Sequence, residues 1–560
     1  MTGGPGTDPG APGAAPAPDP ARFPRRIHEI VERWRAERPE APALAEAGGR
    51  TLDFAGLARA VEAAADRLRR AGVRAGDRVV ILNENSIPAA AFLFACSRLD
   101  AWAVPLNARL AAPEVERLLA HCAPRALVCT HGVSAEAGAH GARHGAEEVT
   151  DPDFGAVLLR GDLPGEPEPV EPESVEPESV EPGNAGQVAA LLYTSGTTGR
   201  PKGVMLTHRN LLYVAVVSGA QRGLSAGDRV YAVLPLSHVF GLSSTFLGTL
   251  QAGGSLLLVP RFDPAHLVEA LAGTGQPPIT VFQGVPAMYA RLLEHLEGAG
   301  RSLAAPALRY MSAGGAPLDL GWKRRIEARF GLPLNNGYGL TEAAPTVAQT
   351  LSRAPRDDET IGPPLPGLEV RIVDPATGAP LPEGAVGELQ VRGPTVMKGY
   401  YRDPEASAAA VTAEGWLRTG DLCRQDPDGY LFLVGRAKEL IIRGGFNVYP
   451  PEVESALNAH PRVAQAGVVG RRLAGDEQVV AFVELAPGPD PAPDEAALKA
   501  FLRERLAPYK RPQRIFVLDA LPASATGKLQ KHRLAEMAES LCAQGETVRP
   551  GATEREGETS

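Results

Sequence analysis

Two alternating patterns of hydrophobic positions run through the first four hundred or so residues. Ile27, Ile30, Val31 and Trp34 fall at i, i+3, i+4 and i+7, which predicts one apolar face of a helix. Asp53 is a suitable cap for a second helix that carries Leu57, Val61 and Leu68. Short apolar segments alternate with further helical ones: strands at 76–83, 188–195, 229–235, 255–259 and 279–284, and helices at 88–99 and 286–296. This alternation predicts a layered α/β body with largely parallel strands.

The pattern changes after residue 436. The expected order becomes a strand at 439–443, a helix at 451–459, strands at 464–470 and 478–485, a helix at 495–506 and a strand at 514–518. About a hundred residues are enough for a separate core. The sequence therefore predicts a large, multi-layered N-terminal α/β domain over residues 25–436 and a small α+β C-terminal domain over residues 437–540.

Three segments lack the periodicity that a packed element needs. Residues 1–24 and 541–560 are expected to be disordered tails. Residues 165–185 form an acidic, Pro-rich stretch with a repeated VEPES unit, which is expected to be a surface loop and is most simply a solvated spacer.

Composition excludes several classes of protein. The chain has 57 basic and 66 acidic side chains, a net charge of −9, and seven of its glutamates lie within residues 166–182. A nucleic-acid-binding protein would carry a basic excess, so that class is disfavoured. Five cysteines without a CxxC pair indicate reduced thiols. No signal peptide and no run of eighteen apolar residues is present, so we expect a cytoplasmic protein without a membrane span.

The strongest local motif is residues 193–203, YTSGTTGRPKG, directly after a predicted strand. Its glycines let backbone N–H groups approach an anion, and its hydroxyls and Lys202 add further donors. The spacing is not that of a P-loop. The segment is therefore predicted to hold a polyphosphate.

This motif resembles the phosphate loop of the adenylate-forming superfamily, which comprises acyl-CoA synthetases, peptide-synthetase adenylation domains and luciferases. Seven more motifs of that superfamily follow in order: LPLSHVFG (234–241), SAGGAPL (312–318), NNGYGLTE (335–342), GELQVRGP (387–394), WLRTGDL (416–422), GRAKELIIRGGFNVYPPEVE (435–454) and PASATGKL (522–529). The resemblance covers residues 25–535 and implies the adenylate-forming fold with a mobile C-terminal domain. It is closest to the acyl-CoA synthetase, or fatty-acid–CoA ligase, type.

The motifs supply a nucleotide site. Tyr338, between glycines, offers a flat ring for adenine, and Asn336 offers an amide for the edge of the base. Asp421 suits the ribose hydroxyls, although an aspartate there could also cap a turn. With the resemblance, the expected ATP- and AMP-binding residues are Thr194, Ser195, Gly196, Thr197, Thr198, Gly199, Lys202, Gly314, Gly315, Ala316, Pro317, Asn336, Gly337, Tyr338, Gly339, Thr341, Asp421 and Arg436. The expected Mg²⁺ ligands are Thr194 and Glu342, because magnesium prefers oxygen ligands.

The expected catalytic residues are Lys528, Lys202, Glu342 and His238. By resemblance, Lys528 steadies the attacking carboxylate and the α-phosphate; the alternative is a solvated surface lysine. His238 is expected beside the acyl carboxylate, and its alternative is a histidine packed at the end of a strand.

The resemblance also implies a rotation of the small domain about a hinge at Lys438. This rotation presents Arg443, Gly444 and Gly445, whose glycines line a narrow channel for the pantetheine arm of coenzyme A. The alternative for the glycine pair is a simple turn between a strand and a helix.

The expected acyl pocket comprises His238, Phe240, Gly241 and Gly314. No acidic residue follows LPLSH, so an amino acid would leave its ammonium unpaired, which is costly. The apolar lining favours a fatty or aryl acid, and we expect a medium- or long-chain fatty acid.

The predicted enzyme is an AMP-forming acid–CoA ligase that uses ATP, Mg²⁺ and coenzyme A. No insertion separates Asp421 from Arg436, which favours free coenzyme A as the acceptor. One alternative enzyme loads an aryl or fatty acid onto the phosphopantetheine of a carrier protein. A non-catalytic protein on the same fold is disfavoured because Lys528, Glu342 and Asp421 are all present. A homodimer is left open.

Overall fold

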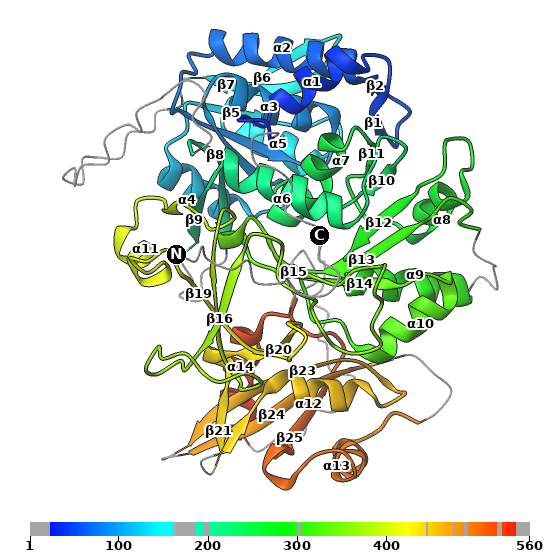
Figure 1. Cartoon of the computed structure of the whole chain (residues 1–560), viewed down its shortest axis with the longest axis vertical. Coiled ribbons are helices and arrows are strands. Elements are labelled where there is room, and N and C mark those ends of the chain that lie inside the picture. The colour runs from blue at the N-terminus through cyan, green and yellow to red at the C-terminus, as the bar shows by residue number, and fades with distance from the viewer. Residues whose placement is uncertain are drawn as a thin grey trace, which may run out of the picture.

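The computed structural model describes residues 23–161, 163, 186–194, 201–298, 304–443, 446–473, 476–486, 491–523 and 529–544. The acidic loop at 165–185 and most of both expected tails lie outside the described residues. A large body holds the N-terminal four fifths of the chain, and the C-terminal elements lie at one end of it (Figure 1).

The first sheet of the large body has eight strands in the order β6-β7-β5-β3-β4-β8-β9-β18. Its inner pairs β5–β3, β3–β4 and β4–β8 are parallel, and the outer pairs are antiparallel. The strands are β3 (Arg78–Asn83), β4 (Trp102–Asn107), β5 (Ala126–Cys129), β6 (Glu147–Asp151), β7 (Gly155–Gly161), β8 (Val188–Thr194), β9 (Lys202–Thr207) and β18 (Gly399–Tyr400). The helices in this part of the chain are α1 (Glu29–Glu37), α2 (Phe54–Arg70), α3 (Ile87–Arg98), α4 (Ala112–Cys122), α5 (Ala135–Arg143) and α11 (Pro404–Ala410).

The second sheet also has eight strands, in the order β15-β14-β13-β12-β10-β11-β1-β2. All pairs from β14 to β1 are parallel, and the two edge pairs are antiparallel. The strands are β1 (Pro42–Glu46), β2 (Thr51–Asp53), β10 (Arg229–Ala232), β11 (Ser255–Leu258), β12 (Val281–Gly284), β13 (Tyr310–Gly314), β14 (Leu334–Gly339) and β15 (Thr346–Gln349). Its helices are α6 (His208–Gln221), the π-helix η2 (Phe240–Leu247), α7 (Gly248–Gln251), α8 (Pro264–Ala272), α9 (Pro286–Gly298), α10 (Leu320–Phe330) and the 3₁₀ turn η3 (Thr341–Ala343).

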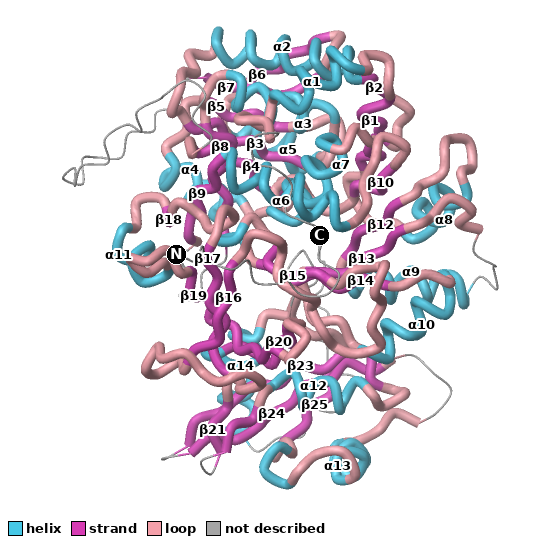
Figure 2. The backbone as a smooth tube through the Cα atoms, in the orientation of Figure 1, coloured by secondary structure: helices cyan, strands magenta, loops and turns pink. Residues whose placement is uncertain are grey.

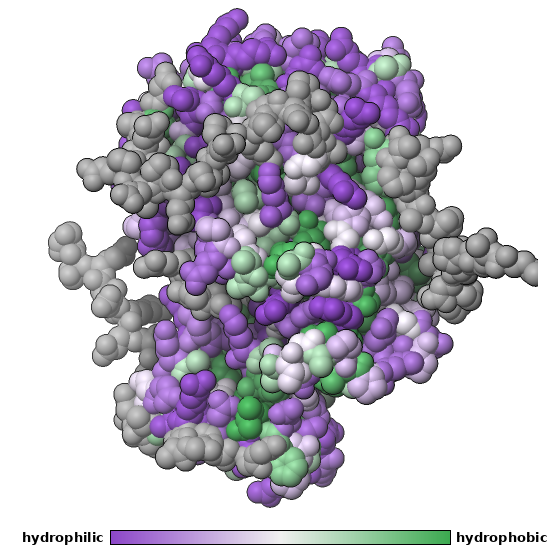
Figure 3. Space-filling model, turned by 60° about the vertical axis from the view of Figure 1, so that its left-hand side comes forward, coloured by the Kyte–Doolittle hydropathy of each residue, from purple (hydrophilic) through white to green (hydrophobic). Residues whose placement is uncertain are grey.

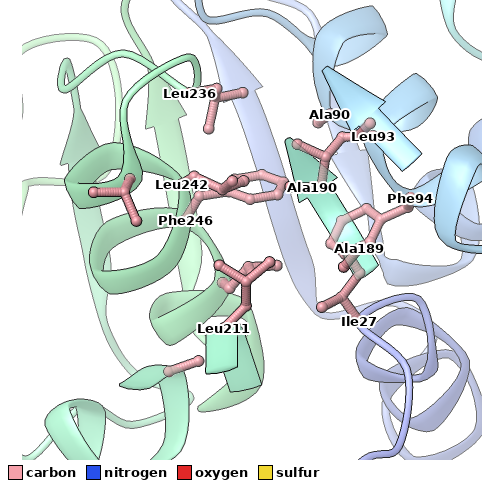
Figure 4. Close-up of a cluster of buried hydrophobic side chains, with 14 of the residues drawn as sticks. Ile27, Ala90, Leu93, Phe94, Ala189, Ala190, Leu211, Leu236, Leu242 and Phe246 are labelled. Carbon is pink, nitrogen blue, oxygen red and sulfur yellow. The ribbon is translucent and has the colours of Figure 1, made fainter. Parts of the chain in front are cut away.

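The main hydrophobic core lies between these two sheets (Figure 4). Helix α3 is apolar on all sides, which suits a helix with no solvent-facing side, and its residues from Ala89 to Ser97 are buried. The ring of Phe94 packs against that of Phe246 from η2, with 5.4 Å between the ring centroids. The two sheets therefore form one body around a shared core.

An antiparallel sheet of order β16-β17-β19-β20 leads from the large body to the C-terminal elements (Figure 2). Its strands are β16 (Glu369–Val373), β17 (Gly387–Arg392), β19 (Leu417–Gln425) and β20 (Leu431–Arg436). The 3₁₀ turn η4 (Ala437–Glu439) follows directly.

The C-terminal unit is α+β. It comprises β21 (Ile441–Arg443), β22 (Phe446–Val448), α12 (Pro450–Asn458), β23 (Val463–Leu473), β24 (Asp476–Leu485), α13 (Glu495–Arg503), η5 (Pro508–Lys510), β25 (Arg514–Leu518) and α14 (Lys531–Gln544). The expectation that disorder begins at residue 541 is wrong, because α14 continues to Gln544. Leu534 and Ala538 bury this helix against Phe482 and Phe516, and Leu541 packs on the same cluster.

Each helix and strand that the sequence analysis named has a counterpart in the structure, but more than half of the helices and strands that the structure describes were not named. Asp53 caps α2 by accepting a hydrogen bond from Gly56 N at 2.6 Å, as expected. Residue 439, expected in a strand, lies in η4, and the short strand β22 was not expected.

The outer face seen in Figure 3 is mainly hydrophilic, with hydrophobic residues in smaller areas. Among the described residues, no helix combines the length and the apolar character that crossing a membrane requires.

Candidate active site

Many of the predicted site residues lie at or directly after the carboxyl ends of neighbouring parallel strands of the second sheet. β10, β12, β13 and β14 are adjacent, and Figure 1 shows β12 to β15 side by side. Their carboxyl ends lead into residues 235–241, 285–286, 314–317 and 337–339. Crevices outside the carboxyl ends of parallel strands are the usual ligand sites of open α/β sheets. The topology therefore brings three separate motifs, at 234–241, 312–318 and 335–342, to one edge.

Tyr338 and Asp421 are in direct contact. The hydroxyl of Tyr338 donates to Asp421 Oδ2 at 2.6 Å, and Arg436 Nε lies 3.0 Å from Asp421 Oδ1. Asp421 and Arg436 are partners across the β19–β20 pair. Burial, together with the charge of Asp421, raises the pKa of Tyr338 well above its usual value, so the hydroxyl stays protonated. Asp421 belongs to a buried cluster and is not an isolated turn cap.

Arg436 connects this cluster to Glu342. Burial lowers the pKa of Arg436, but the nearby carboxylates of Asp421, Glu439 and Glu342 outweigh burial and raise the pKa overall. The nucleotide motifs and the acidic residue of NNGYGLTE therefore share one electrostatic environment.

Gly314, at the end of β13, has close neighbours where a side chain would begin. A Cβ atom on Gly314 would lie 3.1 Å from Gly337 O and 3.2 Å from Phe240 Cε1, so the ring of Phe240 packs directly on the backbone of Gly314. Gly315 adopts a φ of +78°, in the left-handed region that favours glycine. Ala316 and Pro317 continue this turn ahead of α10.

Two expected residues have local partners. Asn336 donates from Nδ2 to Thr360 O at 3.2 Å, so its amide is already fixed to the backbone. His238 is exposed, in the turn between β10 and η2, and its Nδ1 accepts a hydrogen bond from Phe240 N at 3.2 Å. His238 is therefore not a histidine packed in the core.

Lys202 and Glu342 meet at Tyr400, which the sequence analysis did not single out. The Tyr400 hydroxyl donates to Glu342 Oε1 at 2.8 Å, and Lys202 Nζ lies 4.6 Å from the centroid of the Tyr400 ring. Burial and the charge of Glu342 raise the pKa of Tyr400. The sequence places Tyr400 six residues after the end of the GELQVRGP motif, and only the pairing of β18 with β9 brings it to Lys202.

The structure describes only the two ends of the predicted phosphate loop. Thr194 ends β8 and pairs with Lys202, the first residue of β9. Ser195, Gly196, Thr197, Thr198 and Gly199 lie outside the described residues. The two strands leave both ends of that loop beside Tyr400 and Glu342.

The C-terminal site residues are described in part. Lys438 lies in η4, and Arg443 Nη1 donates to the carbonyl oxygens of Tyr509 at 2.9 Å and Arg511 at 3.0 Å. Gly444, Gly445 and Lys528 lie outside the described residues.

Lys531, three residues after Lys528, occupies a partly buried cluster. Its Nζ lies 2.8 Å from Glu439 Oε2 and 3.0 Å from Glu454 Oε1. Burial lowers the pKa of Lys531, but the two carboxylates outweigh burial and raise it. Glu439, the residue after the expected hinge at Lys438, is thereby joined to the start of α14.

Comparisons with known proteins agree with this geometry. Residues 31–401 match the family described as AMP-binding enzyme, and residues 452–528 match the AMP-binding enzyme C-terminal domain. A feruloyl-CoA synthase from Amycolatopsis sp is 38% identical over 486 residues, which are 86% of this chain and 93% of that protein. The 4-coumarate–CoA ligase 2 of Oryza sativa subsp. japonica is 35% identical over 530 residues, 91% of each chain.

Among solved structures, o-succinylbenzoate CoA synthetase (MenE) from Bacillus subtilis in complex with the acyl-adenylate intermediate OSB-AMP is similar. The TM-score is 0.75 at 30% identity, and the match covers 90% of this chain and 97% of that one. The predicted fold class, a large α/β domain followed by a small C-terminal domain, is confirmed.

Proposed function

Since this chain belongs to the AMP-binding enzyme family, as residues 31–401 show, we propose that it activates an aryl carboxylic acid with ATP and transfers the acyl group to coenzyme A. The resemblance to adenylate-forming enzymes is thereby confirmed, and the chain is an ATP-dependent acid–CoA ligase. The acid and the residue roles that follow are our proposals.

The observation that carries the residue roles is two groups of contacts, one at each end of the segment that runs from Tyr338 in β14 to Glu342 in η3. Lys202 and Glu342 contact Tyr400 in one group, and Tyr338 and Arg436 contact Asp421 in the other. Because Tyr338 and Glu342 are only four residues apart, we propose that the phosphate-, metal- and ribose-binding groups lie near one another, as an ATP site requires.

In the first half-reaction, the carboxylate of the acid attacks the α-phosphorus of ATP and expels pyrophosphate. Alignment of the two reactants and neutralisation of charge supply most of the catalysis in such phosphoryl chemistry. Asp421 accepts hydrogen bonds from the ribose hydroxyls, and the adenine stacks beside Tyr338. Lys202 and Lys528 place ammonium groups against the phosphate and carboxylate oxygens, and His238 lies beside the carboxylate.

The residues fit a magnesium ion held mainly by ATP. Glu342 Oε1 accepts from Tyr400, and Oε2 remains for a metal. The described residues contain no group of three His, Cys, Asp or Glu side chains that could hold a metal ion, so phosphate and water oxygens would complete the coordination, with Thr194 at the loop. When bound, Mg²⁺ neutralises phosphate charge.

In the second half-reaction, the thiol of coenzyme A attacks the acyl-adenylate carbonyl and AMP leaves. The C-terminal unit is proposed to rotate about Lys438, which lies in η4 between β20 and β21. Rotation withdraws Lys528 and presents the segment of Arg443, Gly444 and Gly445 to the pantetheine arm.

The proposed substrate is an aryl acid, in place of the fatty acid that was expected from the sequence. The relatives reported above are named for feruloyl and 4-coumarate substrates. In this chain, the Phe240 ring packs against the backbone of Gly314, which places an aromatic side chain in the expected acyl pocket. Gln283 in the neighbouring strand β12 is 2% exposed, and its Oε1 accepts no hydrogen bond from the described residues. A buried amide oxygen suits a ring with a hydroxyl substituent better than a long alkyl chain.

Free coenzyme A is the proposed acceptor. β19 and β20 are joined by a short turn closed by the hydrogen bond from Gly429 N to Asp426 O, with no inserted element. A carrier-protein thiol is the alternative acceptor.

The test is pyrophosphate release with a panel of acids: ferulic, 4-coumaric, benzoic, octanoic and palmitic acid and alanine, each with and without coenzyme A. We expect the highest kcat/KM for a hydroxylated aryl acid and an acyl-CoA product. Preference for palmitic acid would contradict the acid assignment. Pyrophosphate release without any thioester would favour loading of a carrier protein.

A further inference from the structure

Tyr400 contacts two opposite charges with two different parts of its side chain. Its hydroxyl holds Glu342 Oε1 at 2.8 Å while its ring face lies 4.6 Å from Lys202 Nζ. Among the described residues, no ion pair within 4.0 Å joins Lys202 to Glu342 directly. The Tyr400 side chain thus contacts the Lys202 ammonium with its ring and the Glu342 carboxylate with its hydroxyl.

The backbone fixes Tyr400 relative to both partners. Tyr400 pairs with Val204, two residues after Lys202, in the β18–β9 ladder. Its N–H donates to Ser407 Oγ at 2.8 Å, and Met397 N donates to the backbone oxygen of Glu342 at 2.9 Å. Tyr400 is 9% exposed. Its backbone is therefore held in place relative to the strand that carries Lys202 and the turn that carries Glu342.

A direct ion pair here would compete with the substrate. Opposite charges in a partly dry site attract strongly, and a pair once formed must be broken before either member can bind a ligand. A neutral phenol offers each charge a weaker partner: a hydrogen bond for the carboxylate and a π-face for the ammonium. Both charges then remain available to a nucleotide and its metal.

We propose that Tyr400 is a positioning residue that keeps Lys202 free for the triphosphate and orients Glu342 for Mg²⁺. The proposal rests on the proposed function, which makes Glu342 a metal ligand and Lys202 a phosphate ligand. It predicts that the two ends of the Tyr400 side chain have separable effects.

The test compares Tyr400→Phe with Tyr400→Leu in the full chain. One readout is Mn²⁺ binding, followed by electron paramagnetic resonance with α,β-methylene-ATP present. The other is the KM for ATP in ATP–pyrophosphate exchange at saturating Mg²⁺. Tyr400→Phe keeps the ring, so we expect about tenfold weaker metal binding, as for other partners of metal ligands, and an unchanged KM for ATP. Tyr400→Leu also loses the ring, so the KM for ATP should rise about threefold as well.

Tyr401→Phe is the matched control. The adjacent ring packs on Trp102, with 5.7 Å between the ring centroids, and this variant should behave as the wild type. Unchanged metal binding in Tyr400→Phe, or an equal loss in Tyr401→Phe, would overturn the proposal.

Glu342→Gln distinguishes a failure of this inference from a failure of the proposed function. Glu342→Gln should weaken Mn²⁺ binding more than Tyr400→Phe does. Wild-type Mn²⁺ binding in Glu342→Gln would remove the metal assignment itself. Weaker Mn²⁺ binding in Glu342→Gln but not in Tyr400→Phe would refute only the proposed role of Tyr400.

Discussion

At the scale of single residues, Asp421 should contribute to the binding of ATP and not to the binding of the acid. Asn at this position keeps the volume but loses the charge that Arg436 pairs with and one acceptor for the ribose. A hydrogen bond to a charged group contributes about 2 kcal/mol, so Asp421→Asn should raise the KM for ATP at least tenfold and leave the KM for the acid nearly unchanged. ATP–pyrophosphate exchange measures both constants. A KM for ATP within twofold of the wild type would refute the ribose assignment.

Residue chemistry could be anticipated where a motif pairs an uncommon side chain with glycines. Lys202, Tyr338, Glu342 and Asp421 were predicted from such motifs, and in the structure Tyr338 contacts Asp421 while Lys202 and Glu342 both contact Tyr400. Tyr400 was missed because its importance comes from the pairing of two strands that are almost two hundred residues apart in sequence. No local pattern reports such a contact.

At the scale of elements, the cluster of Lys531, Glu439 and Glu454 should hold α14 to the segment after the hinge. Lys531→Met leaves Glu454, whose side chain is 12% exposed, without its cation. Breaking a largely buried pair costs about 3 kcal/mol. We therefore expect a clear fall in the unfolding midpoint of the C-terminal unit, measured by urea denaturation.

Arg324→Met is the control for this prediction. Arg324 and Asp357 form an exposed pair, with side chains 56% and 65% exposed, and such pairs contribute little. Equal destabilisation by the two variants would show that the Lys531 cluster has no special structural role.

Element patterns predicted some of the helices and inner strands because hydrophobic periodicity dictates them. α2 begins after its Asp53 cap, and β3 lies within the predicted strand at 76–83. The pattern failed at α14, whose apolar contacts to Phe482 and Phe516 depend on the tertiary core, and at β22, where only three residues pair. The antiparallel edges of both sheets could not be inferred either, since period-2 patterns do not encode strand direction.

At the scale of the whole molecule, the two proposed half-reactions require two orientations of the C-terminal unit, related by a rotation about η4. Lys528 serves only the first state, and the segment around Arg443 serves only the second. The two half-reactions should therefore respond differently to one substitution, which no single rigid site would allow.

The most direct measurement is mass spectrometry of the products formed from ATP and a hydroxylated aryl acid, before and after coenzyme A is added, in the wild type and in Lys528→Ala. We predict acyl-adenylate and pyrophosphate before the addition, and thioester and AMP after it. Lys528→Ala should form little adenylate yet convert supplied acyl-adenylate to thioester at nearly the wild-type rate. Formation of ADP and phosphate, or equal loss of both steps in Lys528→Ala, would contradict the account.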